Sequence, residues 1–97
     1  MSETKSAFTE RLQSQLRLLE ADMDRLKARA LVAKADARVA MEKQIQSLES
    51  KREAVKQQVD KLKSSGDDAW QSLKEGLESA WKDLKEACSE AKDRFQA

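Results

Sequence analysis

Apolar residues recur every three or four positions from Phe8 to Leu62, with one polar interruption at Arg52. This spacing places them on one stripe of an α-helix, and runs of consecutive four-residue steps give the stripe some hendecad character. Neither Gly nor Pro occurs between Lys5 and Lys63, so the pattern predicts one continuous helix over about residues 5–63. Such a helix would be about 90 Å long and cannot bury its own stripe. The stripe contains Phe8, Leu12, Leu16, Leu19, Met23, Leu26, Ala30, Ala33, Ala37, Met41, Ile45, Leu48, Val55, Val59 and Leu62.

One turn signal divides the chain, at residues 64–67. Gly66 suits the left-handed position that follows a helix, and Ser65 or Asp67 suits the N-cap of the next helix. The alternative is a continuous rod with Gly66 inside it, which loses only about 1 kcal/mol at that residue. The turn signals favour a hairpin with a second helix over about residues 68–95. The predicted fold is therefore all-α: a coiled-coil hairpin of one long and one half-length helix, in a single domain over residues 1–97.

The second predicted helix contains an internal repeat of eleven residues, in which segments 69–79 and 80–90 share Ala, Trp, Leu, Lys and Glu at matching positions. Because eleven residues complete three helical turns, matching residues stack on one face. Gly76 occupies the position that Ala87 has in the second copy, on this packed face. We expect the face to pack within the hairpin, or to meet a partner or a lipid surface. It contains Trp70, Leu73, Leu77, Trp81, Leu84, Cys88 and Phe95.

The Ala-Trp-x-x-Leu-Lys-Glu motif, at residues 69–75 and 80–86, resembles the tandem amphipathic repeats of exchangeable apolipoprotein-type helices. It is also similar to small bacterial coiled-coil proteins of uncharacterised role. The resemblance covers about the last third of the chain. It implies reversible lipid binding by the second helix, which would open from the first helix and expose its two Trp residues.

Two residues on the apolar stripes have alternative roles. Cys88 is expected to be a small core residue, and the alternative is a redox or lipidation site, which requires exposure or a lowered thiol pKa. Arg52 either packs its stem at the edge of the core or makes a register-setting polar contact, with its neighbours Glu49 and Glu53 as candidate partners. Both Trp residues are expected to be core anchors, with a surface role as the alternative.

Composition narrows the classes of function. The 97 residues include no His, one Cys and two Gly. This excludes a zinc finger, a Cys–His nucleophile pair and a glycine-rich phosphate loop, so we expect no enzyme, no metal and no cofactor. The longest apolar run has only four residues, Ala30 to Ala33. Together with the polar N-terminal residues, it predicts neither a membrane span nor a secretory signal, and the expected location is the cytoplasm.

Charge differs between the two predicted helices. Residues 1–66 carry 14 basic and 10 acidic side chains, whereas residues 67–97 carry 5 basic and 8 acidic ones. The resulting net charges of +4 and −3 modestly favour pairing of the two helices. Basic and acidic residues alternate along the first helix, which disfavours nucleic acid as a partner because a nucleic-acid binder typically presents a stripe of one sign.

Helix lengths predict self-association. The second helix can cover only about residues 34–63 of the first, so a second copy is expected to cover the rest. In an antiparallel homodimer, residue i lies near residue 67 − i of the partner, and the Ala-rich centre permits close approach. A parallel dimer, a trimer and a complex with an unidentified protein stay open. The predicted function is a non-catalytic, self-associating structural or protein-interaction module, with lipid binding as the alternative. The predicted seam contains Leu12, Leu16, Leu19, Met23, Leu26, Ala30, Ala33 and Ala37.

Overall fold

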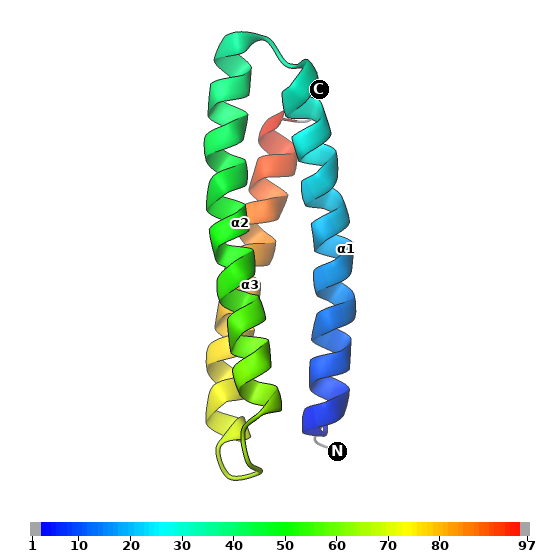
Figure 1. The fold of residues 1–97 in the computed structure, drawn as a ribbon, viewed down its shortest axis with the longest axis vertical. Coiled ribbons are helices and arrows are strands. Elements are labelled where there is room, and N and C mark those ends of the chain that lie inside the picture. The colour runs from blue at the N-terminus through cyan, green and yellow to red at the C-terminus, as the bar shows by residue number, and fades with distance from the viewer. Residues whose placement is uncertain (1–2, 96–97) are drawn as a thin grey trace.

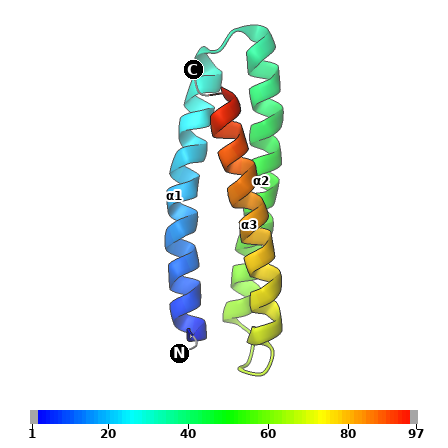
Figure 2. The same cartoon turned by 180° about the vertical axis from the view of Figure 1, so that it is seen from behind.

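The computed structural model describes residues 3–95, and within that range the chain is helical with no strand. It has three helices: α1 (Lys5–Val32), α2 (Ala35–Lys63) and α3 (Trp70–Phe95). Figures 1 and 2 show α1 and α2 running in opposite directions, with α3 packed along both of them and antiparallel to α2. The result is a narrow three-helix bundle of 51 × 20 × 16 Å.

The prediction of one helix over residues 5–63 is wrong, because the chain leaves the helix at Ala33 and Lys34 and reverses direction (Figure 1). Both residues are extended, with φ/ψ of −76°/153° at Ala33 and −65°/155° at Lys34. The Arg38 guanidinium spans the turn and donates to the carbonyl oxygens of Ala30 and Leu31, at 3.0 and 2.6 Å. Ala and Lys are strong helix formers, so local preference does not explain this turn. Tertiary burial does, because the reversal lets α1 and α2 cover each other's apolar stripes.

The predicted apolar stripe forms one core among the three helices. Six residues of the predicted seam are buried inside this single chain, whereas Ala33 is partly buried and Ala37 is exposed. A second copy is therefore not needed to cover α1, since α2 and α3 of the same chain cover it. The six buried seam residues are Leu12, Leu16, Leu19, Met23, Leu26 and Ala30.

The pairing of α1 with α2 has a defined register. Lys27 Nζ lies 2.8 Å from Glu49 Oε1, and Arg52 Nη1 lies 3.8 Å from Glu20 Oε2. The midpoints of these pairs fall at residues 38 and 36. The antiparallel pairing predicted between two chains is thus present within one chain, and its centre lies near Ala37 rather than at Ala33 and Lys34.

The second link confirms that α3 folds back, but its details differ from the prediction. It runs over residues 64–69, so α3 begins at Trp70 rather than near residue 68. Gly66 is not left-handed, because no glycine of the described residues has a positive φ. Two serines close the end of α2 instead: Ser64 Oγ donates to the Lys61 carbonyl oxygen at 3.1 Å, and Ser65 Oγ donates to that of Leu62 at 2.6 Å. Hydroxyl donors satisfy these carbonyls without a left-handed residue.

Two leucines differ strongly in the exposed fraction of their side chains. Leu84 of α3 is 0% exposed, whereas Leu18 of α1 is 72% exposed. We expect Leu84→Ala to lower the free energy of unfolding by about 3 kcal/mol, because it leaves a cavity in the core. Leu18→Ala is the matched control and should change it by less than about 0.5 kcal/mol. Urea denaturation followed by circular dichroism measures both, and equal losses would contradict the proposed core.

Gly76 lies exposed in α3, with no heavy atom within 4 Å of the position that a Cβ would take, so the expected packed position is wrong. Ala87, its counterpart in the repeat, is partly buried. Gly76→Ala should raise the free energy of unfolding by about 1 kcal/mol, because alanine removes backbone entropy from the unfolded chain without a clash. A lower midpoint in urea denaturation would mean that the site is more crowded than the structure indicates.

Candidate interaction surfaces

One end of the bundle carries a group of exposed aliphatic side chains. Leu31, Val32 and Val39 are 74%, 86% and 55% exposed. They lie on the last turn of α1 and near the start of α2, on either side of the turn at residues 33–34. This end, residues 28–40, is termed the α1–α2 tip, and it is at the top of Figure 1. The other exposed large hydrophobic residue of the described chain, Leu18, lies alone midway along α1.

A shallow apolar hollow lies between the α1–α2 tip and the end of α3. Figures 1 and 2 show that the last turn of α3 stops below the connection between α1 and α2. Phe95, the last residue of α3, is only partly buried there. Arg29 donates to the Phe95 carbonyl oxygen at 3.3 Å and ties α1 to this end of α3. The hollow is lined by Arg29, Val32, Ala33, Lys34, Ala37, Met41, Arg94 and Phe95.

The α1–α2 tip is the positive end of the bundle. Residues 28–40 contain three basic side chains and one acidic side chain, a net charge of +2, whereas the whole chain carries +1. Two of these cations are engaged locally: Arg29 donates to the Phe95 carbonyl oxygen, and Arg38 caps the end of α1. Lys34, in the turn itself, is exposed and forms no ion pair with another described residue.

The structure brings the predicted apolar face of α3 together, against α1 and α2. Trp70, Leu77, Leu84 and Cys88 are buried, and Leu73, Trp81 and Phe95 are partly buried against the core. The rings of Phe8 and Trp70 are 6.4 Å apart at their centroids, and Lys74 Nζ lies 5.4 Å from both. Lipid binding through this face therefore requires α3 to leave the bundle.

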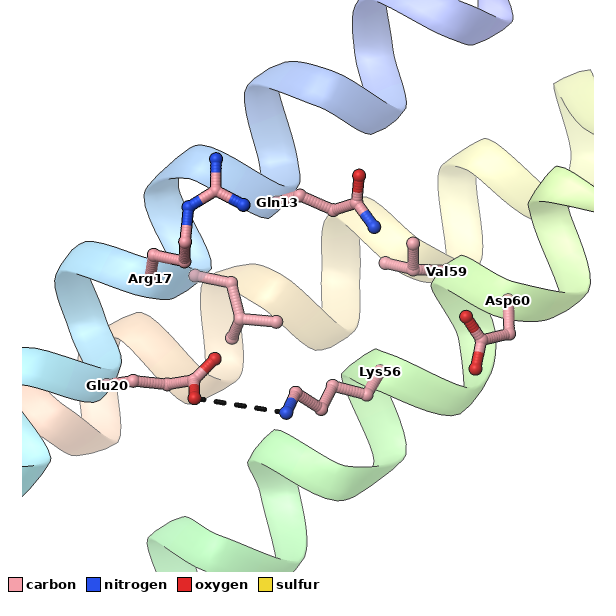
Figure 3. A pocket seen from close by; sticks show the side chains of 7 residues that line it. Gln13, Arg17, Glu20, Lys56, Val59 and Asp60 are labelled. Carbon is pink, nitrogen blue, oxygen red and sulfur yellow. Dashed lines mark ion pairs between the residues drawn. The ribbon is translucent and has the colours of Figure 1, made fainter.

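A polar groove separates α1 from α2 on the side away from α3 (Figure 3). Glu20 Oε2 lies 3.8 Å from Lys56 Nζ and equally far from Arg52 Nη1. Arg52 thus makes a polar contact with the opposite helix rather than an ion pair with Glu49 or Glu53, while its buried Nε has no hydrogen-bond partner. Opposite charges meet across this groove, and its lining residues carry two basic and two acidic side chains.

The α1–α2 tip is the surface that sequence analysis missed. Its aliphatic residues lie off the regular seam, and the run from Ala30 to Ala33 is far too short to suggest a membrane span. The available signal was the seven-residue spacing of Val32 and Val39, which places both on one face beside the seam. Their position at the end of the bundle depends on the reversal at Ala33 and Lys34, which the local sequence does not predict.

Comparisons with known proteins add no functional assignment: no protein-family model, curated protein or solved structure matches the chain. Among residues 3–95, no helix is both long and apolar enough to cross a bilayer. The same residues contain no cluster of three or more His, Cys, Asp or Glu side chains placed to hold a metal ion. A function for this chain must therefore be inferred from the surfaces described above.

Cys88 is buried in the core, and burial raises the pKa of its thiol. The nearby Asp22 carboxylate raises this pKa further, while Lys92 partly opposes the shift. Because the thiolate is the reactive form, we expect the native protein to react with a thiol-specific disulfide reagent far more slowly than the urea-unfolded chain at the same mildly alkaline pH. Equal rates in the two states would contradict the burial of Cys88.

Proposed function

We propose that this protein is a non-catalytic structural module that self-associates by exchanging α1 between two copies. In the proposed antiparallel homodimer, residues 5–63 of each chain form one continuous helix. Each half of the dimer then contains α1 of one copy packed against α2 and α3 of the other. Exchange of identical elements is a common route to dimers because it reuses contacts that already exist within the monomer.

The observation that carries this proposal is the phase of the apolar seam. Ala30, Ala33, Ala37 and Met41 follow one another at helical spacing through the turn, as though no turn were present. In the closed chain, which is the three-helix monomer with its turn at residues 33–34, the seam is interrupted there. Ala37 is exposed, while Ala30 and Met41 are buried. The register of α1 against α2 is centred near Ala37, so a continuous helix would bring Ala37 against its counterpart on the two-fold axis.

The turn itself supports the proposal, because its sequence favours a helix. Residues 28–40 contain six Ala and neither Gly nor Pro, and Ala has the highest helix propensity. Lys34 stands at the N-cap of α2 without any side-chain cap, and its positive charge is unfavourable at a helix N-terminus. By contrast, the link at residues 64–69 is rich in Ser, Gly and Asp. The sequence therefore favours a turn at residues 64–69 but permits a continuous helix across residues 33–34.

Exchange retains the core of the closed chain. Every buried residue of α1 keeps its neighbours, now supplied by the second copy, and the α2–α3 packing stays within one chain. The dimer gains free energy from helical hydrogen bonds across residues 33–34 and from burial of Ala37. The cost is the entropy of association, so the closed monomer is favoured at low concentration and the dimer at high concentration.

Lys34→Pro tests the exchange. The φ of −65° at Lys34 is the value that proline imposes, Ala33 is already extended, and the Lys34 N–H donates no hydrogen bond to a described residue. The closed chain should accept the substitution, whereas each continuous helix would lose about 3 kcal/mol. We expect the wild type to form dimers with increasing concentration in sedimentation velocity, and Lys34→Pro to stay monomeric.

Lys34→Ala is the control, because it removes the same charge but keeps helix propensity, and it should dimerise at least as well as the wild type. The isolated wild-type dimer should also persist for a long time after dilution, since separating exchanged helices requires unfolding. A wild type that stays monomeric throughout, or a Lys34→Pro variant that dimerises equally, would overturn the proposal.

A further inference from the structure

From the closed monomer we infer a second binding activity: the α1–α2 tip docks on an anionic lipid surface, inserting Leu31, Val32 and Val39 between headgroups while the surrounding cations contact lipid phosphates. This inference does not rest on the exchange of α1. It concerns a different state of the chain, because the continuous helix of the dimer removes the turn and with it the tip.

The chemistry of the tip matches this surface. Val32 is 86% exposed and Leu31 is 74% exposed, and the exposed Lys34 follows them in the turn. Aliphatic side chains gain free energy when they leave water for the acyl boundary, and each nearby basic residue adds attraction to anionic headgroups. The net charge of +2 over residues 28–40 supplies this attraction at the same end.

The shape of the tip favours a membrane over an acidic protein. The bundle is narrow, 20 × 16 Å across its long axis, so its end alone offers only a small convex surface to a protein partner. A stable protein interface buries about 800 Å² on each partner. A lipid surface has no such minimum, because it surrounds a narrow convex tip and receives its side chains individually. The bundle also stays folded, since all three aliphatic residues already lie outside the core.

Vesicle co-sedimentation tests this inference at protein concentrations where the chain is monomeric. We expect the wild type to bind phosphatidylcholine vesicles that contain phosphatidylglycerol, and to bind pure phosphatidylcholine much less. The double variant Leu31→Ser, Val32→Ser should weaken binding by at least about tenfold, because it removes the inserted apolar surface. Lys34→Gln should weaken it about fivefold, and added salt should weaken it further.

Leu18→Ser is the control, because Leu18 is 72% exposed, close to the value for Leu31, but lies midway along α1. This variant should bind vesicles like the wild type. Circular dichroism should show the same helicity for all variants. Tryptophan emission should not change on binding, because Trp70 and Trp81 stay packed in the bundle.

Three results would overturn the inference. The first is equal binding to neutral and anionic vesicles, or binding to neither. The second is vesicle binding that shifts tryptophan emission to the blue and survives the tip substitutions, which would indicate that α3 opens onto lipid instead. The third is binding to polyglutamate but not to vesicles, which would indicate an acidic protein partner. Lys34→Pro sedimentation is independent of all three, so this inference and the exchange of α1 fail separately.

Discussion

The whole structure depends on covering one apolar stripe that runs from Phe8 to Leu62. A single helix cannot bury such a stripe, and the chain covers it by folding α2 back on α1 and laying α3 along both. This requirement outweighs local preference at Ala33 and Lys34, where two good helix formers adopt extended backbone. It also explains why α1 and α2 have nearly equal lengths, since each is the cover of the other.

Periodicity predicted the helical content and the buried residues of the stripe. The turn signals at residues 64–67 predicted the end of α2 and the return of α3. Neither signal predicted the turn at Ala33 and Lys34, because the free energy that forms it comes from contacts between residues far apart in sequence. Gly66 shows the opposite error: its chemistry suits a left-handed cap, but serine hydroxyls already satisfy the carbonyls at the end of α2.

The candidate surface was hidden for the same reason. Leu31, Val32 and Val39 sit beside the seam in the sequence, and only the reversal of the chain turns them into a protruding end. The excess of basic over acidic residues around them is already present in the sequence, and the reversal of the chain places it at one end of the bundle. Surface chemistry of this kind depends on which residues the turn brings together, whereas core chemistry can be inferred from spacing alone.

The contact of Arg38 with the turn has a consequence for the proposed exchange of α1. In the closed form its guanidinium occupies the carbonyl oxygens of Ala30 and Leu31. In a continuous helix the same two oxygens would accept from the backbone N–H groups of Lys34 and Ala35. The side chain therefore stands in for the missing helical turn. If the chain exchanges α1 as proposed, both carbonyl oxygens have a hydrogen-bond donor in the monomer and in the dimer, so releasing Arg38 leaves neither of them without a partner.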